Sequence, residues 1–446
     1  MTPTRWAALL GAAFVYYAWL IAGPGFALFA PVLRGTVFQS MLSHLLAGKF
    51  DIDPGVIGNE GFLRDGRVYA YFGIVPALLR LPLAAFPTLF DTDVTRLSCA
   101  LAAALTSVYQ LRLLALVAAH APTQRAVLLA LAAGVLIGGP QVQFLNASIY
   151  QEVLSWALVF AAGFVFAAVQ GLLEAPGFNR PIMLRLALFA GLALLTRSST
   201  GTGLALAFTL IWLVQLRRSR HVTAALTLAA LAALCGGINV ARWGDPFTFV
   251  DVRLHLMNTE FPDRLARLPA TGLFSLNRLW FGLQYYLLPI WSIPLPDGTM
   301  VFEKTQAWLV EAELPPGSML LSDPLLLALS AWFVLARWWR LALDRLAMAG
   351  TFIGLALPAG AILVFAFMDF RYRMEFYPLM TFCAALALTG DPTPQPGWLG
   401  KIPLSIMTIT GIVSAHMFLW WYQIAPFGPA DYPHLFFFWK HVLTGG

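Results

Sequence analysis

The stretch FMDFRYRMEFYPLM, residues 367–380, places four charged side chains within seven positions, between two apolar runs. Two of them, Arg371 and Arg373, flank Tyr372. Arginine presents a planar fork of N–H donors that fits phosphate oxygens, and it stays ionised near lipid. We therefore predict that Arg371, Arg373 and Tyr372 bind the phosphate of a lipid. The alternative is an anchor at the lipid headgroups, in which the two acids of the stretch pair with its arginines.

A further arginine interrupts an apolar region at ALLTRSSTGTG. Arg197 is followed by the hydroxyl side chains of Ser198, Ser199 and Thr200, which could help it to bind an anion within the protein. The alternative is that its long side chain extends along apolar surface to the membrane interface. We predict anion binding, so Arg197 joins the phosphate-binding candidates.

Four carboxylates could act as a general base, which requires only hydrogen-bond reach of an acceptor hydroxyl. Three lie in the segment AGKFDIDPGVIGNEGFLRDGRVYAYFG and are Asp53, Glu60 and Asp65. Their alternative role is turn formation, because DPG and DG favour turns. The fourth is Glu152, a few residues into a later apolar run, where a carboxylate is costly unless it faces a polar cavity. Its alternative is an N-terminal helix acid stabilised by the helix dipole.

A second polar region contains DVRLHLMNTEFPDRLARLP and NRLWFGLQYYLLPIW. Its aromatic residues, Trp280, Tyr285, Tyr286 and Trp291, are predicted to form a belt at the membrane interface. The alternative is a stacking platform that binds an acceptor sugar. That acceptor site would consist of Trp280, Tyr285, His255 and Glu260.

These groups belong to a very apolar chain. Of its 446 residues, 59% are hydrophobic and 11% charged, and the mean hydropathy is +0.74. A soluble protein carries roughly a quarter charged residues. Since apolar windows of about 20 residues recur throughout, we predict an all-α polytopic membrane protein with about 11 or 12 transmembrane helices. The candidate spans are 6–28, 70–90, 97–117, 124–139, 150–170, 183–196, 201–216, 222–241, 323–338, 346–366, 376–390 and 402–423.

Two long connections divide these spans. We predict an N-terminal membrane module at 1–241 containing a first long loop at 31–69, a second long loop at 242–322, and a C-terminal membrane module at 323–446. Loops of this length are usually functional. Lys and Arg in short loops mark the cytoplasmic side. LRRSRH and ARWWRLALDR carry this signal, so both long loops and the first arginine stretch are expected on the opposite side.

The same rule places the N-terminus in the cytoplasm, because of Arg5. The first long loop then lies on the far side, and six spans separate it from the cytoplasmic LRRSRH, although a crossing from the far side to the cytoplasm needs an odd number of spans. We therefore expect one segment to be re-entrant, half-length or fused to its neighbour. The candidates are 70–90, with its Gly, Pro and Arg80, and the pair of spans broken at 196–200.

Several classes of site lack support in the sequence. The three cysteines lie in apolar runs and are expected to be core residues. The seven histidines show no metal-ligand spacing, and there is no HExxH, Walker loop, GxGxxG or GxSxG motif. The net charge of +6 comes mostly from loop arginines, which fits anionic lipid headgroups and not nucleic acid.

The chain resembles the GT-C class of integral-membrane glycosyltransferases, which use polyprenyl-phosphate sugars as donors. FQSMLSHLLAGKFDI followed by DGRVYAYFGIVPALLRLPL resembles their first long loop and the span after it. SIYQEVLSWAL and FAGLALLTRSST resemble two later junctions, and NVARWGDPFTF is similar to the segment that opens their second loop. MDFRYRMEFYPLM resembles their late arginine junction. The order of these segments along the chain carries most of the resemblance.

The resemblance implies a site on the non-cytoplasmic face, in which the first loop supplies a catalytic carboxylate and arginines hold the donor phosphate. The family's acid follows the first span, where this chain has APVLRGTVFQSM, without Asp or Glu. Either the base has moved to one of the four carboxylates named above, or the chain lacks transferase chemistry. No cofactor is required, and a divalent cation bridging Asp53 or Asp65 and the donor phosphate is left open.

The resemblance implies a transferase that moves a sugar from a polyprenyl-phosphate donor to a glycan or lipid acceptor, with inversion. The alternative is a lipid-linked sugar transporter or a non-catalytic lipid-binding scaffold. The expected partners are the donor, the acceptor and membrane lipids, without nucleic acid. The composition favours a bacterial inner membrane, with the site facing the periplasm.

Overall fold

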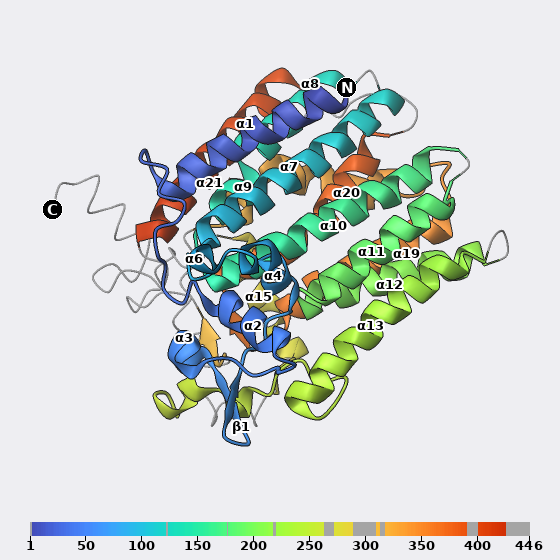
Figure 1. Ribbon diagram of the computed structural model, residues 1–446. Coiled ribbons are helices and arrows are strands. Elements are labelled where there is room, and N and C mark those ends of the chain that lie inside the picture. Colours follow the sequence, from blue (N-terminus) through green and yellow to red (C-terminus); the bar gives the residue numbers. More distant parts are fainter. Residues whose placement is uncertain are drawn as a thin grey trace. The chain divides into compact units, whose positions relative to one another are not determined.

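The computed structural model describes residues 2–121, 124–175, 177–216, 220–262, 272–288, 309–312, 317–389 and 400–424. These residues form helices almost throughout, with four strands of two or three residues (Figure 1). Within them, seven segments are long and apolar enough to span a membrane. They are α1 (Pro3–Ala22), α7 (Thr95–His120), α8 (Arg125–Ile137) with α9 (Gly139–Gln143), α10 (Ile149–Leu173), α13 (Val222–Trp243), α19 (Arg345–Leu363) and α21 (Lys401–Ile424). The prediction of an all-α polytopic membrane protein is confirmed.

Four of the other predicted spans are shorter helices. They are α11 (Arg180–Leu194), α12 (Ser198–Gln215), α18 (Pro324–Trp332) continued by the π-helix η8 (Phe333–Arg337), and α20 (Tyr377–Ala387). Together with the seven longer segments, eleven of the twelve predicted spans are therefore helical in the described part of the chain.

The candidate span 70–90 is wrong as a continuous helix. It folds as three helices of four residues each, α4 (Val75–Leu78), α5 (Leu81–Ala84) and α6 (Pro87–Phe90). Each has a proline in its first two positions, and proline cannot donate the backbone hydrogen bond that a helix interior needs. The backbone N–H groups of Gly73 and Val75 instead donate to carbonyls at the junction of α11 and α12. The broken segment thus contacts the other expected break, at 196–200.

The chain forms two compact units. Unit 1 comprises Met1–Gln110, Leu145–Pro262 and Ala342–Pro358, and unit 2 comprises Leu111–Phe144, Asp263–Leu341 and Ala359–Gly446. The three modules expected from the sequence, at 1–241, 242–322 and 323–446, stay a prediction.

In unit 1, the first long loop is structured. It contains α2 (Val37–Leu46), α3 (Pro54–Ile57), the 3-10 helix η1 (Gly58–Glu60) and an antiparallel hairpin of β1 (Phe62–Arg64) and β2 (Arg67–Tyr69), with Phe62 opposite Tyr69. The start of the second loop adds the 3-10 helices η3 (Val252–Leu254) and η4 (Leu256–Thr259). Leu256 N–H donates to Gly61 O at 2.9 Å, so the two loops meet.

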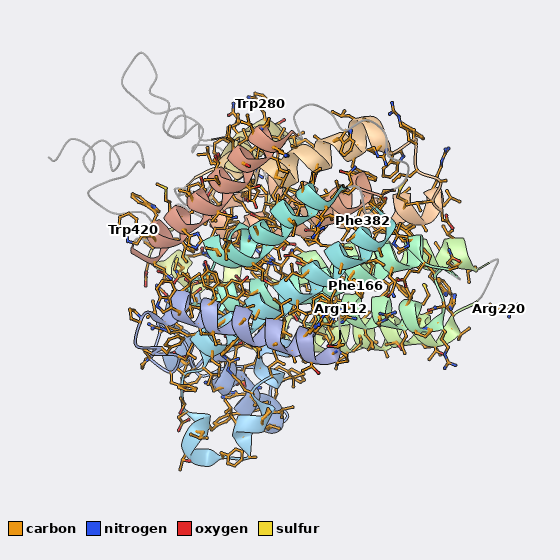
Figure 2. All side chains as sticks on the ribbon, turned by 90° about the horizontal axis from the view of Figure 1, so that it is seen from above. Arg112, Phe166, Arg220, Trp280, Phe382 and Trp420 are labelled. Atoms are coloured by element: carbon orange, nitrogen blue, oxygen red, sulfur yellow. The ribbon has the colours of Figure 1, made fainter. Side chains whose placement is uncertain are left out.

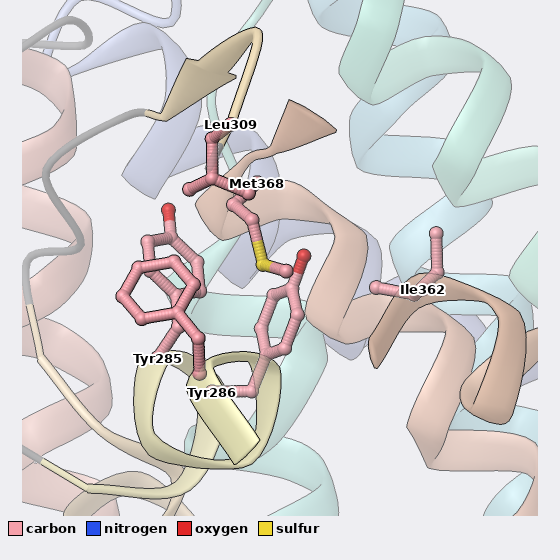
Figure 3. Packing of buried hydrophobic residues seen from close by; sticks show 6 residues of the cluster. Tyr285, Tyr286, Leu309, Ile362 and Met368 are labelled. Carbon is pink, nitrogen blue, oxygen red and sulfur yellow. The ribbon is translucent and has the colours of Figure 1, made fainter. Parts of the chain in front are cut away.

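In unit 2, the arginine stretch lies between α19 and α20. It forms β4 (Phe367–Met368), which pairs in parallel with β3 (Glu311–Ala312), and the 3-10 helix η9 (Phe370–Phe376). Nearby are η5 (Leu276–Arg278), α15 (Leu279–Leu287) and α17 (Met319–Ser322). A hydrophobic cluster joins α15 to β4 (Figure 3). Its buried members are Phe281, Tyr285, Tyr286, Leu309, Ile362 and Met368.

Glycines allow α12 and α19 to approach closely in unit 1. A Cβ atom on Gly203 would lie 2.6 Å from the carbonyl oxygen of Gly354, and one on Gly354 would lie 2.5 Å from the backbone nitrogen of Ala207. Small residues at such positions are how helices pack in a membrane, where lipid removes much of the hydrophobic drive for association.

The substitution Gly354→Ala is therefore expected to destabilise the protein by about 1–3 kcal/mol, because the new methyl group meets backbone atoms that cannot move aside. The measurement is the thermal unfolding midpoint of purified protein in detergent. Gly360→Ala in the same helix is the control, since nothing lies within 4 Å of its Cβ position. Equal midpoints for the two variants would contradict the close approach.

Candidate functional site

In unit 1, Glu60 lies in a polar cluster built from both long loops. Its Oε1 is 3.7 Å from Nη1 of Arg34, and its Oε2 is 3.5 Å from Nε2 of His255. The Glu60 side chain is 13% exposed and that of His255 is 10% exposed, so both are shielded without being sealed from solvent. The cluster brings together two predicted candidates, Glu60 and His255, that are 195 positions apart in the sequence.

Backbone and ring contacts hold this cluster in place. Phe62 forms an isolated antiparallel bridge with His255, and their rings are stacked with centroids 4.6 Å apart. Behind them, Phe62 packs edge-on against Trp243 at 5.8 Å and belongs to a core cluster with Tyr69. Since Trp243 ends α13, the ring of Phe62 links the imidazole to the end of a membrane helix.

Polar side chains complete the rim. Arg34 donates through Nη2 to Asn59 Oδ1, and Asn59 Nδ2 donates to the carboxylate of Glu260 at 3.1 Å. The predicted acceptor-site residue Glu260 is thus one side chain away from Glu60. Arg34 has φ = +61°, a backbone conformation that is uncommon and costly for a non-glycine residue.

The charge of Glu60 follows from these neighbours. Burial raises the pKa of its carboxyl, but the contacts with His255 and Tyr150 and the positive charge of Arg34 outweigh it and hold the pKa below its ordinary value. Glu60 is therefore an anion at neutral pH, ready to accept a proton.

The other two loop carboxylates perform turn chemistry. Asp53 is the N-cap of α3 and accepts from Gly55 N–H at 2.8 Å. Asp65 occupies the hairpin tip with φ = +50°, followed by Gly66 at φ = +75°. Its side chain is 82% exposed and pairs with its neighbour Arg64 at 3.3 Å. The turn-forming alternative describes both residues.

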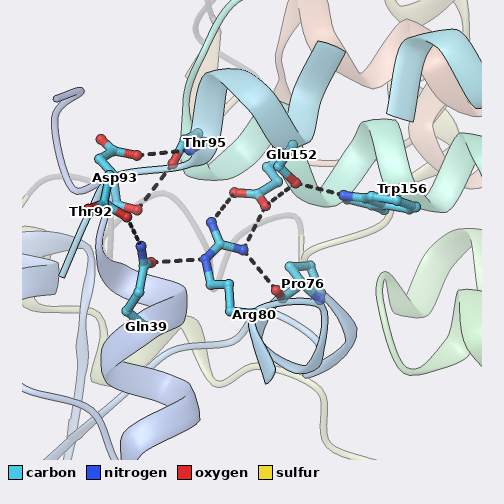
Figure 4. Close-up of polar contacts among 10 residues, drawn as sticks. Gln39, Pro76, Arg80, Thr92, Asp93, Thr95, Glu152 and Trp156 are labelled. Carbon is cyan, nitrogen blue, oxygen red and sulfur yellow. Dashed lines mark hydrogen bonds and ion pairs between the residues drawn. The ribbon is translucent and has the colours of Figure 1, made fainter. Parts of the chain in front are cut away.

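Glu152 forms a buried ion pair with Arg80 (Figure 4). Arg80 donates through Nη1 to Oε1 at 2.8 Å and through Nη2 to Oε2 at 3.0 Å, and both side chains are fully shielded. Ser98 donates a third bond to Oε1 at 2.5 Å, and Gln39 accepts from Arg80 Nε at 2.9 Å. Ser148 caps α10, and Glu152 lies in the first turn of that helix, as the alternative of an N-terminal helix acid expects. Glu152 therefore lies in a satisfied network that links α10 to the broken segment.

In unit 2, the two arginines of the first stretch differ. Arg371 pairs with Asp369 at 2.5 Å and lies 5.6 Å from the ring of Tyr372, a half-buried residue. This ion pair is the intramolecular pairing that the anchor alternative expects.

Arg373 is fully buried, and burial lowers its pKa to about 10, which leaves it charged at neutral pH. Its Nη2 donates to the carbonyl oxygens of Gly317 and Tyr285, and it lies 4.8 Å from the ring centroid of Phe370. Among the described residues, Nε and Nη1 have no hydrogen-bond partner.

One carboxylate whose charge acts on Arg373 is Asp323. Asp323 Oδ2 accepts from Tyr377 at 2.6 Å, Ser322 at 2.6 Å and Gln143 at 3.1 Å. The charge of Asp323 favours the charged form of Arg373. This buried acid, which the sequence analysis did not select, compensates the positive charge beside it.

The remaining candidates are dispersed. Arg197 is half-buried and precedes α12 as its N-cap residue. Tyr285 and Tyr286 lie in the hydrophobic cluster of unit 2, which is contrary to an interfacial belt for these two residues. Trp280 is 68% exposed and points outward (Figure 2). Trp291 lies outside the described residues.

The sequence analysis missed three members of the Glu60 cluster, which are Arg34, Asn59 and Tyr150. The one available signal was position: Arg34 stands in APVLRGTVFQSM, where the resembled family has its acid.

A divalent cation that bridges Asp53 or Asp65 and the donor phosphate stays a prediction. Among the described residues, no group of three His, Cys, Asp or Glu side chains could hold a metal ion. Asp53 and Asp65, the carboxylates considered for this role, are occupied by a helix cap and a hairpin tip. We derive no chemical step through a metal.

Comparison with known proteins reveals a likeness in fold. No protein-family model matches the chain, and no curated protein matches it. Among solved structures, the chain is similar to the apo oligosaccharyltransferase of Archaeoglobus fulgidus, with a TM-score of 0.50 and 13% sequence identity. The likeness covers 94% of this chain and 56% of that protein, so the chain spans little more than half its length. It supports the GT-C-like fold, and at this identity it concerns the fold alone.

The Arg80–Glu152 pair yields a stability prediction. Arg80→Ala is expected to destabilise the protein by about 3–5 kcal/mol, because it leaves a buried carboxylate without its charge partner. The double variant Arg80→Met with Glu152→Leu should lose less than Arg80→Ala alone, since no unpaired charge remains. Chemical unfolding in detergent, with exposed Arg340→Ala as the control, measures both. A larger loss in the double variant would contradict a primarily electrostatic role for the pair.

Proposed function

We propose that the chain is a membrane glycosyltransferase, which moves a sugar from a polyprenyl-phosphate donor to a hydroxyl group of a glycan or lipid acceptor. The reaction takes place on the non-cytoplasmic face of the membrane, which is the periplasmic face of a bacterial inner membrane. The likeness in fold to an oligosaccharyltransferase supports this class. The observation that carries the proposal is the Glu60 cluster, where the two long loops meet around an ionised and partly accessible carboxylate.

Glu60 is the best base of the four carboxylates. Asp53 and Asp65 have turn roles at exposed positions, and Glu152 is closed off by a two-point contact with Arg80. In the proposed step, Glu60 takes the proton of the acceptor hydroxyl. At the same time the oxygen of that hydroxyl bonds to the anomeric carbon of the donor sugar. The bond from that carbon to the phosphate oxygen breaks, and its electron pair leaves with polyprenyl phosphate. A single displacement inverts the anomeric configuration.

The donor phosphate requires compensation of its growing negative charge. Arg373 supports this role, because it is charged and has two nitrogen atoms without partners among the described residues. Arg371 would exchange Asp369 for a phosphate oxygen, with Tyr372 beside it, and Arg197 is a further candidate. On the acceptor side, His255 and Glu260 belong to the Glu60 cluster, and Trp280 offers an exposed ring.

One observation favours the alternative of a transporter or non-catalytic scaffold for the same lipid. Arg34 occupies the segment in which the resembled family carries its acid, and it pairs with Glu60. Such a protein would bind the donor without breaking the bond between sugar and phosphate.

A transfer assay in lipid nanodiscs separates these functions. Purified protein is supplied with a panel of polyprenyl-phosphate sugars and candidate acceptors, and released polyprenyl phosphate is scored by mass spectrometry. Glu60→Gln is expected to lower the rate at least about a hundredfold, as expected for loss of a general base. Asp65→Asn, at the hairpin tip, is the matched control and should leave the rate unchanged. If every donor binds without release, the alternative stands; full activity in folded Glu60→Gln rejects Glu60 as the base.

The role of Arg371 in binding the donor phosphate is tested in the same nanodiscs. The measurement is the equilibrium affinity for the donor that supports transfer. Arg371→Ala should weaken binding about tenfold or more, because a charge-assisted hydrogen bond contributes roughly 1.5–3 kcal/mol. Arg340→Ala removes an exposed arginine of the same unit and should bind normally. Equal affinities for the two variants would assign Arg371 to anchoring.

A further inference from the structure

The imidazole of His255 is held in a fixed orientation beside the carboxylate of Glu60. Binding of an acceptor sugar would not require this contact. The stacked ring of Phe62 and the bridge to its backbone set the plane of the imidazole, and Nε2 lies 3.5 Å from Oε2 of Glu60, without a hydrogen-bond partner among the described residues. This distance is longer than a hydrogen bond and within ion-pair range. Catalytic hydrogen bonds are often long before substrate is bound, so the contact can tighten during reaction.

The geometry points to a shared function: we propose that Glu60 and His255 act as one proton acceptor, in which Glu60 takes the proton from the acceptor hydroxyl and His255 stores it. This inference rests on the proposed function and names the group that completes its proton transfer. It assigns to His255 a role different from sugar binding.

The charged groups around His255 are consistent with this role. From η1, Glu60 supplies the adjacent negative charge; from the preceding loop, Arg34 contacts the other oxygen of that carboxylate. Directly after η4, Glu260 accepts a hydrogen bond from Asn59. Tyr150 of α10 bonds to Glu60, and the face of Phe62 is uncharged.

Charges on the element that precedes His255 are already satisfied. Arg253 pairs with Asp251 at 2.7 Å, and its side chain is 80% exposed. The neighbour that can exchange a proton with Nε2 is therefore the Glu60 carboxylate.

The direction of the proton follows from the relative basicity of the two groups. Three neighbours hold the pKa of Glu60 below its ordinary value, so Glu60 retains a proton weakly. A free imidazole binds a proton about two pH units more tightly than a free glutamate. Glu60 is thus suited to pass a proton on, and the adjacent imidazole is placed to receive it beside a carboxylate anion.

The step balances as follows. The acceptor O–H bond breaks and its proton passes to Glu60, while the oxygen forms the glycosidic bond and polyprenyl phosphate leaves with the electron pair of the broken bond. The proton then passes from Glu60 to Nε2 of His255, which restores the carboxylate and forms imidazolium. Imidazolium releases the proton to water before the next turnover.

Because the imidazole stores the proton, activity should fall when His255 is already protonated. The rate profile is therefore expected to have an acid limb that reports the protonation of His255. Activity is present above this limb and is lost as the pH falls through it.

The test compares pH profiles of kcat/KM in nanodiscs for the unmodified protein and His255→Gln. Glutamine keeps an N–H group that can contact Glu60 but cannot store a proton. We expect the acid limb to move down by at least one pH unit and the maximal rate to fall about ten- to a hundredfold. Arg253→Gln, two residues away and exposed, is the control and should keep the original profile.

The outcomes separate the two proposals. If Glu60→Gln abolishes transfer but His255→Gln keeps the original acid limb, the proton store is rejected while the transferase and its base stand. If no donor turns over, NMR titration of the histidines still decides the pairing. The His255 signal, assigned by its loss in His255→Gln, should titrate at lower pH in Glu60→Gln than in the unmodified protein; an unchanged midpoint overturns the pair.

Discussion

The cost of burying charge in an apolar chain determines how the polar residues of this protein are arranged. An isolated ion moved out of water loses several kcal/mol even after relaxation, so a buried charge must be paired and hydrogen-bonded. Arg80 and Glu152 satisfy each other through two donor–acceptor contacts, and Gln39 and Ser98 satisfy their remaining groups. That network fixes the broken segment 75–90 against α10. It allows a stretch with three prolines to be part of a membrane protein without forming a span.

The same constraint separates structural charges from candidate functional ones. Glu152 has no capacity left for a substrate, whereas Glu60 has neighbours at 3.5 and 3.7 Å and retains some exposure. In unit 2, Arg371 is neutralised by Asp369, while Arg373 is charged, buried and only partly bonded among the described residues. Glu60 and Arg373 are charges that are expensive to bury, and their neighbours satisfy them only in part. For this reason we place the chemistry at Glu60 and phosphate recognition at Arg373.

The fold class could be predicted from the sequence, because a long apolar segment in lipid can adopt few structures other than a helix. Eleven of twelve predicted spans are helical, and the exception at 70–90 was already suspect from its Gly, Pro and Arg80. Its three short helices could not be predicted, because they depend on carbonyls of residues 195 and 196 that are remote in sequence.

The site was accessible only in part. Glu60 and His255 were both selected, but for different roles, and their proximity depends on a loop-to-loop bridge at Phe62 that no local pattern indicates. Asp65 resembled Glu60 as a candidate until the positive φ of the hairpin tip showed its turn role. Arg34 was missed because its importance comes from three-dimensional pairing and an unusual backbone conformation, neither of which is visible in composition.

The central claim is that the Glu60 cluster receives the acceptor hydroxyl. The most direct measurement is a cryo-EM structure of the Glu60→Gln variant in nanodiscs with a donor that turns over and its acceptor. The account predicts the acceptor hydroxyl within hydrogen-bond reach of the residue 60 side chain, about 2.6–3.2 Å, and facing the anomeric carbon. An acceptor hydroxyl lying instead against Asp53 or Asp65, or a sugar bound away from the two loops, would contradict it.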